Sequence, residues 1–363
     1  MPPWETYLPS APPLGTRTHP LVRFVGLASR LLLSRWCNSV KVRGLDGFLR
    51  ILRDEERLKS GRGILTYANH ISVMDDPTLF GCMPPETIQD PALTRWTLGA
   101  RDIMFTNPLF GYFFRTGQVL CTDRGRGVFQ PSIDKSIDLL EAGAWVHIFP
   151  EGYVNMSRKS RCRRFKWGVG RMLLEAGRSA FSKSAGSAES ALAPLVVPIW
   201  ITGFDAMMPE PRGNPRWLPR PGANITIDIG KPINATLDPL LDTLSSSTSG
   251  DEKSVEECVS DLDILSDAYP LPSESLFPER TPLAPPPGGV PWPVPLAESR
   301  SAHAIEKLGA DSSFARHARS LVSNELRAHL VKLGAESRKA GGVPLGLVHR
   351  LMDEEDESNR GLL

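Results

Sequence analysis

The chain has 363 residues, of which 41% are hydrophobic and 23% charged, with 33 prolines and 31 glycines. That length suffices for one core of about 200 residues with tails, or for two small domains. The 42 basic residues nearly balance the 41 acidic ones, which argues against a dedicated nucleic-acid-binding protein. Five scattered cysteines lack zinc-type spacing, so neither a disulfide framework nor a bound metal is expected.

Residues 1–20 are rich in proline and predict an irregular leader, whose scarcity of acidic residues is compatible with mitochondrial targeting. The next segment, 21–44, predicts an amphipathic helix, because Arg23, Arg30 and Ser34 form a narrow polar stripe at 100° per residue. Such a helix is either covered by protein or lies in a membrane interface, and the cations beside its large apolar face favour the interface. The residues expected to contact the membrane are Phe24, Leu27, Leu31 and Trp36.

Residues 45–232 alternate between strand-like and helix-like patterns. Strands are predicted near 63–70, 117–121, 144–149, 195–201 and 225–229, and helices near 133–140 and 167–178. Alternation of this kind predicts an α/β fold with a mostly parallel sheet covered by helices. Together with the interfacial helix at 21–44, we expect a monotopic protein, which associates with one face of a membrane. No run of about 18 apolar residues occurs, so a conventional membrane-spanning helix is not expected.

The remaining segments differ in composition from this domain. Residues 179–193 are rich in serine and alanine and predict a mobile loop. The segment 233–300 is acidic and rich in proline and serine, and we expect it to be a disordered insertion. An apolar stripe with arginine and lysine opposite predicts a docked C-terminal helix within 301–340, and residues 341–363 read as an acidic, solvated tail.

The most informative motif follows the first predicted strand of the domain. His70 and Asp75 are five residues apart, which in a regular helix would separate their side chains by about 140°. A direct contact therefore requires a non-helical turn between them. With such a turn, the Asp75 carboxylate accepts the Nδ1 proton of His70 and leaves Nε2 free as a general base. The alternative is that Asp75 merely caps a helix while His70 lies on the surface.

A second polar motif follows the strand at 144–149, where Pro150 ends the strand and Gly152 allows a tight turn that projects Glu151. The carboxyl ends of parallel strands meet at one edge of a sheet, so this motif is expected beside His70. The alternative is an exposed glutamate in an ordinary strand-exit turn.

A cluster of positive charge adds to these motifs. Residues 151–183 contain nine basic and two acidic residues, and Arg124 lies in another glycine-rich loop. A solvated face is the ordinary explanation for such a run, but the interleaved Phe165 and Trp167 favour a membrane interface or phosphate-bearing ligands. The residues proposed to bind anionic lipid headgroups are Arg158, Arg163, Arg164, Lys166 and Arg171.

In this order, the motifs resemble the conserved blocks of the glycerolipid acyltransferase superfamily. The finer text, Asn-His-x-Ser-x-x-Asp-Asp-Pro (69–77), Trp-Val-His-Ile-Phe-Pro-Glu-Gly (145–152) and Val-Asn-Met-Ser (154–157), resembles its mitochondrial phospholipid–lysophospholipid transacylases. The resemblance implies that His70 and Asp75 are catalytic. It assigns substrate binding to Asn69, Arg124, Phe149, Pro150, Glu151 and Gly152. Tyr153 departs from the basic residue expected after this glycine, which puts one headgroup contact in doubt.

The implied reaction moves acyl chains between phospholipids and lysophospholipids without acyl-CoA, metal or other cofactor, with cardiolipin, monolysocardiolipin and phosphatidylcholine as expected substrates. The expected place is a mitochondrial membrane, inner or outer, on the side of the intermembrane space, with no nucleic acid as partner. One alternative is a CoA-dependent lysophosphatidate or lysophospholipid acyltransferase with the same catalytic pair. Another is a non-catalytic protein that binds anionic lipids. Oligomeric state and acyl-chain selectivity do not follow from the sequence.

Overall fold

The computed structural model describes residues 18–155, 162–177, 192–209, 214–215, 218–246 and 313–342. Seven strands within these residues form one sheet, in the order β1-β7-β6-β2-β5-β3-β4. They are β1 (Ser39–Arg43), β2 (Ile64–Ala68), β3 (Trp96–Ala100), β4 (Val119–Thr122), β5 (Trp145–Ile148), β6 (Leu195–Thr202) and β7 (Asn224–Ile229). All neighbouring pairs are parallel except β6 and β7, so the predicted, mostly parallel sheet is confirmed.

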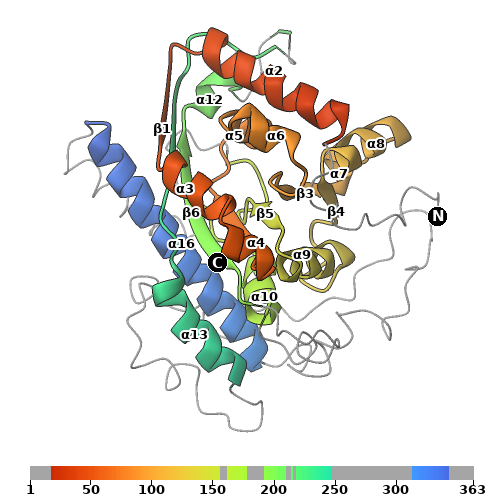
Figure 1. Ribbon diagram of the computed structural model, residues 1–363, viewed down its shortest axis with the longest axis vertical. Coiled ribbons are helices and arrows are strands. Elements are labelled where there is room, and N and C mark those ends of the chain that lie inside the picture. The colour runs from red at the N-terminus through yellow and green to blue at the C-terminus, as the bar shows by residue number, and fades with distance from the viewer. Residues whose placement is uncertain are drawn as a thin grey trace.

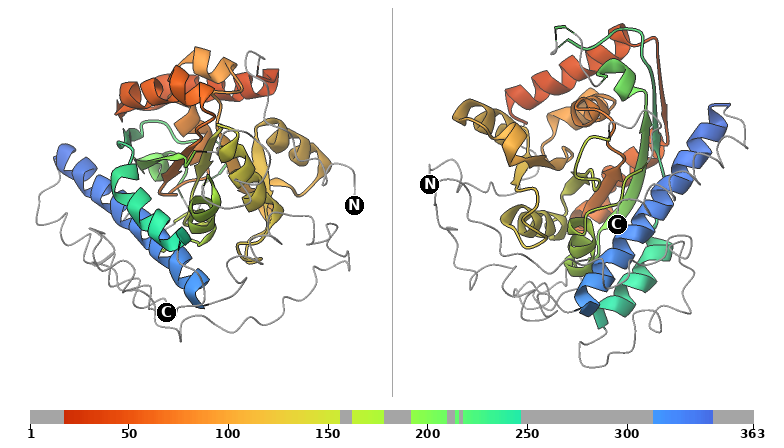
Figure 2. Two further views of the ribbon diagram at one scale, coloured as in Figure 1. Left: turned by 60° about the horizontal axis from the view of Figure 1, so that its bottom comes forward. Right: turned by 180° about the vertical axis from the view of Figure 1, so that it is seen from behind.

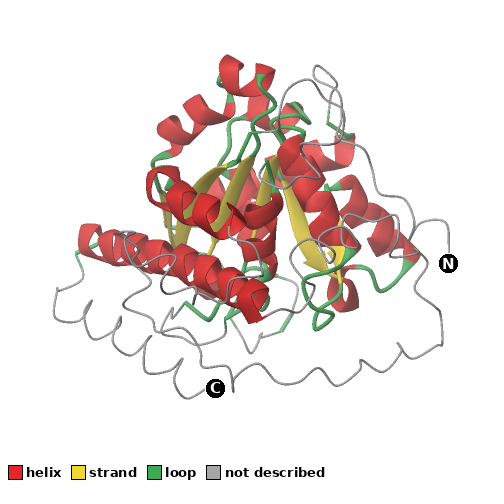
Figure 3. Ribbon diagram, turned by 90° about the horizontal axis from the view of Figure 1, so that it is seen from below, coloured by secondary structure: helices red, strands yellow, loops and turns green. Residues whose placement is uncertain are grey.

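Helices cover both faces of this sheet (Figures 1 and 3). One side carries α2 (Pro20–Trp36), α3 (Leu45–Leu52), α4 (Glu55–Lys59), α5 (Asp75–Gly81), α6 (Pro85–Gln89) and α12 (Phe204–Met207). The other carries α9 (Pro131–Glu141), α10 (Gly168–Glu175), α13 (Asn234–Ser246) and α16 (Ser313–Ala340). Two short helices, α7 (Arg101–Met104) and α8 (Pro108–Thr116), follow β3.

Two hydrophobic clusters explain why the central strands are mostly apolar. On β2, Leu65 and Tyr67 belong to the cluster under α9, α10, α13 and α16. Ile64 and Ala68 on the same strand belong to the cluster under α2, α3 and α5. Successive side chains of a strand point to opposite faces, so a strand buried on both faces is apolar on both, and the one polar residue of β2, Thr66, is hydrogen-bonded to His147 and Trp145.

The N-terminal helix ends earlier than the sequence pattern predicts. Instead of running to residue 44, α2 ends at Trp36 and β1 follows at Ser39. One face of α2 packs on α5 and α6, where Gly26 lies so close to Ile88 that a Cβ would be 2.7 Å from its Cγ2. The opposite face leaves Phe24, Leu27, Leu31 and Trp36 exposed. The helix is therefore packed against protein on one side and apolar toward solvent on the other.

The first part of the acidic segment, which the sequence predicts to be disordered, is a helix. Residues 234–246 form α13 with four buried leucines, Leu237, Leu240, Leu241 and Leu244. The docked C-terminal helix is confirmed as α16, but Arg319 and Arg327 are buried rather than solvated. Residues outside the described part of the structure include 1–17 of the predicted leader (1–20), most of the loop at 179–193, residues 247–300 and almost all of the acidic tail.

Candidate active site

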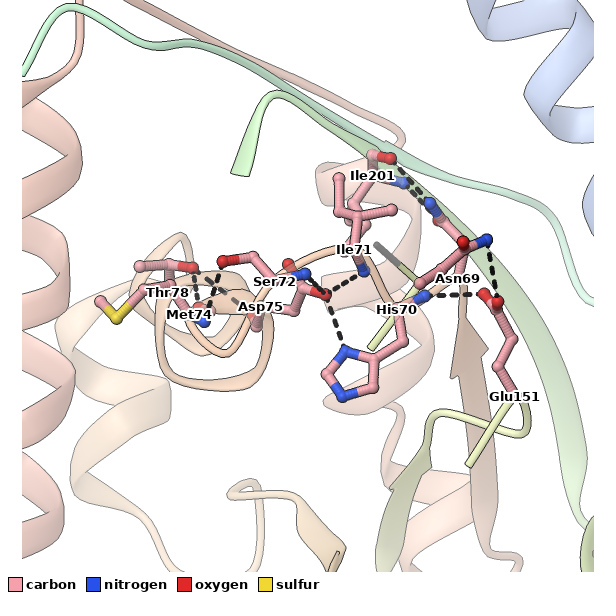
Figure 4. A network of polar contacts seen from close by, with 10 residues as sticks. Asn69, His70, Ile71, Ser72, Met74, Asp75, Thr78, Glu151 and Ile201 are labelled. Atoms are coloured by element: carbon pink, nitrogen blue, oxygen red, sulfur yellow. Dashed lines mark hydrogen bonds and ion pairs between the residues drawn. The ribbon is translucent and has the colours of Figure 1, made fainter. Parts of the chain in front are cut away.

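The loop from β2 to α5 places His70 against Asp75. Residues 70–74 are not helical, and α5 begins at Asp75 itself, as a direct contact requires. His70 Nδ1 lies 2.8 Å from Asp75 Oδ2, and the same oxygen accepts hydrogen bonds from the backbone N–H of Ile71 (2.6 Å) and Ser72 (2.8 Å) (Figure 4). The predicted contact between His70 and Asp75 is confirmed. The alternative, in which His70 lies on the surface without this contact, is wrong.

These contacts determine which nitrogen of His70 is available. Asp75 is fully buried, and burial raises the pKa of its carboxyl group while the hydrogen bonds from His70, Ser72 and Ile71 oppose that rise. Besides the hydrogen bonds from two backbone N–H groups, the carboxylate accepts a third from the Nδ1–H of His70. Nε2 then carries the free lone pair, and the His70 side chain keeps 21% of its surface exposed. This is the arrangement that a general base with an orienting carboxylate requires.

Two rings from β5 and its exit support the His70 imidazole. Phe149 stacks on His70 with ring centroids 4.3 Å apart and an interplanar angle of 23°. Behind it, His147 meets Phe149 edge-on at 4.7 Å and shares a 2.8 Å hydrogen bond between Nδ1 and Thr66 Oγ1. Burial lowers the pKa of His147 to about 4, so this second histidine is neutral near pH 7. Phe149 acts on the base itself by fixing its ring plane.

Glu151 joins the two polar motifs, as parallel neighbours β2 and β5 require. Its Oε1 accepts a hydrogen bond from the backbone N–H of His70 (2.9 Å), and its Oε2 accepts one from the backbone N–H of Arg163 (3.0 Å). Asn155 donates through Nδ2 to Oε2 at 3.4 Å. Burial raises the pKa of Glu151 to about 8, against the hydrogen bonds from His70 and Arg163. The carboxylate lies behind the base and holds its backbone (Figure 4).

Three other predicted substrate-binding residues shape the loops. Asn69 is buried and pairs with the backbone of Ile201, donating to its oxygen at 2.9 Å and accepting from its nitrogen at 2.8 Å. This contact fixes the β2 exit to β6, so Asn69 lies behind the site instead of facing a substrate. Pro150 is buried, and its carbonyl accepts a hydrogen bond from Lys166 N–H. Gly152 adopts φ = 73°, the left-handed turn that the sequence predicts for a glycine.

Positive side chains gather around Tyr153, at the exit of the Glu151 turn. The Arg124 guanidinium lies 4.6 Å from the centre of the Tyr153 ring, and Arg163 Cζ and Lys166 Nζ each lie 5.8 Å from it. Arg124 is also paired with Asp102 of α7. Burial and the nearby Arg163 and Arg164 lower the pKa of Lys166. We name these four residues, Arg124, Tyr153, Arg163 and Lys166, the Tyr153 cluster.

Part of the predicted headgroup belt does not face solvent. Arg171 is fully buried and pairs with Glu175 (2.7 Å) and Asp134 (2.7 Å), so its charge is used inside the protein. Phe165, expected at a membrane interface, is likewise buried and packs edge-on against Tyr67. Arg164 is half-buried with its guanidinium 6.0 Å from the Trp167 ring centre. Arg158 lies outside the described residues.

Comparison with known proteins places this geometry in a family. Residues 50–202 match the family model described as Acyltransferase. The chain is 37% identical over 209 residues to the protein named Taffazin of Dictyostelium discoideum, which covers 58% of this chain and 67% of that relative. It is 33% identical over 266 residues to Tafazzin of Saccharomyces cerevisiae, covering 61% of this chain and 66% of the relative. The chain belongs to the tafazzin family of acyltransferases.

Other matches have different names. The chain is 33% identical over 209 residues to N-acylphosphatidylethanolamine synthase of Arabidopsis thaliana, which covers 57% of this chain and 67% of that protein. Among solved structures, the chain resembles the 1-acyl-sn-glycerophosphate acyltransferase PlsC of Thermotoga maritima with a TM-score of 0.39 and 18% identity, over 58% of this chain and 67% of that one. The match to the Acyltransferase family model shows that the chemistry of this chain is acyl transfer.

Some functional features escape reasoning from the sequence alone. His147 lies in the quoted motif, but its place behind Phe149 follows from the pairing of β5 with β2. Arg327 of α16 donates to the Cys162 carbonyl through Nε (3.3 Å) and Nη2 (2.9 Å), next to the residue whose N–H holds Glu151. Within the described residues, no group of three potential ligands could hold a metal ion, and no helix is long and apolar enough to cross a membrane.

Proposed function

We propose that this chain is a CoA-independent transacylase that moves acyl chains from phospholipids to lysophospholipids. The observation that carries the proposal is the base: His70 is held through Nδ1 by buried Asp75, with Nε2 turned away from that contact (Figure 4). Membership of the tafazzin family supports a phospholipid as acyl donor.

The reaction exchanges one ester for another. His70 Nε2 takes the proton of a lysophospholipid hydroxyl while that oxygen attacks the carbonyl carbon of an ester in the donor phospholipid. The tetrahedral intermediate then collapses, the bond between the carbonyl carbon and the donor glycerol oxygen breaks, and the imidazolium returns its proton to that leaving oxygen. Asp75 stabilises the imidazolium between the two steps. Because the bond broken and the bond formed are both carboxylic ester bonds, the equilibrium constant is close to one.

The Tyr153 cluster is the proposed headgroup site. It places three cations next to the Glu151 turn, which is hydrogen-bonded to His70. Guanidinium and ammonium groups are the usual partners of phosphate in proteins. Lys166 places its ammonium group beside the Tyr153 ring. This cation takes the place of the basic side chain that the family resemblance leads one to expect at position 153. We propose monolysocardiolipin as acceptor, phosphatidylcholine as donor and cardiolipin as product.

The proposed location is a mitochondrial membrane on the side of the intermembrane space, with attachment through one leaflet. The exposed apolar face of α2 and the arginines of that helix support attachment at a membrane interface. Phe24, Leu27, Leu31 and Trp36 are the proposed contacts.

A reconstituted assay separates the candidate reactions. Purified protein is mixed with vesicles that contain phosphatidylcholine labelled in its acyl chains, monolysocardiolipin and phosphatidylethanolamine, without acyl-CoA. Label in cardiolipin is expected with the wild type and with the exposed-site control Lys59→Ala, and not with His70→Ala. Transfer that starts only after acyl-CoA is added would move the enzyme to the CoA-dependent class. Label on the phosphatidylethanolamine nitrogen would indicate the reaction for which the Arabidopsis relative is named. Absence of transfer under all these conditions would favour a lipid-binding role.

A further inference from the structure

An exposed apolar surface on α8 is not explained by the site. In this helix, Leu109 is 73% exposed and Phe110, Tyr112 and Phe113 are also exposed. Ile103 of the preceding α7 is 58% exposed. A nine-residue helix of a soluble protein does not ordinarily expose this much aromatic and aliphatic area. Exposed apolar patches of this kind mark interaction surfaces. The sequence pattern did not single out this helix.

The surface of α8 continues the exposed face of α2. The two helices lie at the same end of the molecule in Figure 1 and in the right-hand view of Figure 2. His19, the N-cap of α2, meets Tyr112 of α8 with ring centroids 6.4 Å apart. On α2 the exposed side chains are Phe24, Leu27, Leu31 and Trp36. We name the exposed apolar side chains of these two contacting helices the α2–α8 surface.

The charge around this surface selects a lipid bilayer as its occupant. Neither α2 nor α8 contains an acidic residue, and Arg30 and Arg35 of α2 are exposed, while Arg115 of α8 is half-buried beside Phe105. Trp36 and Tyr112 have amphipathic rings of the kind enriched at the boundary between hydrocarbon and headgroups. Apolar side chains between arginines and interfacial aromatics are the composition of elements that lie in the plane of an anionic membrane.

The α2–α8 surface also adjoins the catalytic edge of the sheet. α2 packs on α5, whose first residue is Asp75, and α8 follows β3, the parallel neighbour of β5. In α7, Asp102 pairs with Arg124 of the Tyr153 cluster, while the next residue, Ile103, is exposed. A bilayer in contact with α8 would therefore lie next to the cations proposed to hold the headgroup.

We propose that α8 inserts its exposed side chains into the same leaflet as α2, so that the α2–α8 surface sets the orientation of the enzyme on an anionic bilayer. This extends the proposed function, on which the choice of a lipid partner rests, by adding a second contact that fixes rotation as well as attachment. A single amphipathic helix would leave the molecule free to roll about that helix axis.

The test measures binding, not activity. Leu109→Glu/Phe110→Glu places two carboxylates at exposed positions of α8, and its partition onto vesicles of phosphatidylcholine with phosphatidylglycerol is followed by flotation. We expect about a tenfold fall relative to the wild type. The control Leu192→Glu changes an exposed leucine just before the amino end of β6, outside α2 and α8, and should bind like the wild type. The single variant Leu109→Ser, at the most exposed position, provides a milder change should the double variant not fold.

Each outcome has a defined meaning. Wild-type binding by both α8 variants would overturn the proposal. Unchanged vesicle binding, with a dimer of the wild type converted to a monomer by the α8 variant, would assign the surface to a second copy of this chain instead. If the wild type binds vesicles through α8 but catalyses no acyl transfer, the docking surface stands and the proposed function fails.

Discussion

At the scale of single residues, Asp75 carries out two tasks with one oxygen. Its Oδ2 accepts a hydrogen bond from His70 Nδ1–H and two more from the backbone N–H groups of Ile71 and Ser72. The backbone bonds hold the carboxylate in place before any substrate arrives, so the base is oriented in advance. A buried group with this arrangement cannot rotate to a new partner without leaving N–H donors unpaired.

Replacing Asp75 with Asn should therefore remove catalysis while keeping the shape of the site. The amide oxygen can take the place of Oδ2 and accept the same hydrogen bonds. The neutral amide does not stabilise the imidazolium that forms when Nε2 takes the proton of the substrate hydroxyl. We expect turnover in the vesicle assay to fall about a thousandfold. The control Asp46→Asn, at an exposed position of α3, should leave turnover unchanged. Full activity of Asp75→Asn would contradict the assigned role.

His147 makes the fold sensitive to acid. Burial lowers its pKa from 6.5 to about 4, so the unfolded chain binds a proton at this residue before the folded protein does. The stability linked to His147 is present above pH 6.5 and is lost as the pH falls from 6.5 toward 4. Below that window both states are protonated and the dependence ends.

His147→Gln tests this linkage, because glutamine does not titrate and keeps an acceptor for the Thr66 hydroxyl. Thermal unfolding midpoints of the wild type and the variant are compared between pH 7.5 and 4. The wild type should lose stability more steeply than the variant between pH 6.5 and 4. Parallel curves would show that His147 is protonated in the folded protein as readily as in the unfolded chain.

At the scale of elements, the ends of the strands could be predicted from the sequence. The hydrogen-bond partners of the side chains in the loops that follow these strands could not. Apolar runs located β2 and β5, and the rule that parallel strands share a carboxyl edge correctly placed His70 near Glu151. The destinations of Asn69 and Glu151 depend on which backbone groups a neighbouring strand or loop presents. Both side chains bond to main-chain atoms of Ile201, His70 or Arg163, which residue types in a sequence do not reveal.

The arginines of α16 show a similar limit. Opposite an apolar stripe, arginine predicts a solvated face, yet Arg327 is buried and donates twice to the Cys162 carbonyl. The next residue along, Arg163, gives its N–H to Glu151. The positive charge of Arg327 also opposes the burial that raises the pKa of Glu151. α16 therefore supports the catalytic loop from beneath.

Arg327→Met should weaken catalysis through Glu151. Removal of the guanidinium frees the Cys162 carbonyl and raises the pKa of Glu151 further, with Arg163 left as its nearby cation. Because Glu151 of the wild type has a pKa of about 8, we expect turnover to fall about tenfold or more near pH 8 and to recover partly as the pH rises further. Arg327→Lys keeps the charge and should retain more activity, and the exposed control Lys332→Met should match the wild type. An equal loss at every pH would show a purely structural role.

At the scale of the whole molecule, composition averaged over a long segment concealed a structural element. The acidic, proline-rich character of residues 233–300 predicts disorder, but its first 13 helical residues carry leucines at positions 237, 240, 241 and 244. That spacing of three, one and three is the apolar stripe of a helix. The domain boundary predicted at residue 232 was therefore wrong, because the strongest compositional signal lay farther along the segment.

α13 and α16 complete the layer that covers one face of the sheet, as Figure 2 shows. Gly334 of α16 lies so close to the Trp200 ring of β6 that a Cβ there would be 2.7 Å from it, and Gly170 of α10 lies equally close to the backbone of Arg319. Contacts this tight indicate a helix that is part of the core, although it follows 66 residues after α13 in the chain.

A chain ending at residue 246 should therefore not reach the native state. Without α16, the apolar surface of β6 and α10 is left uncovered, and the burial of Leu321, Val322, Leu326 and Leu330 is lost. At about 1.5–3 kcal/mol for each such side chain, the loss is comparable with the whole stability of an ordinary domain. We expect this chain to be aggregated or to lack near-ultraviolet circular dichroism, while a chain ending at Gly342 unfolds cooperatively. A folded and active chain without α16 would show that α2 to α13 suffice for the enzyme, and would remove the support that Arg327 gives to the catalytic loop.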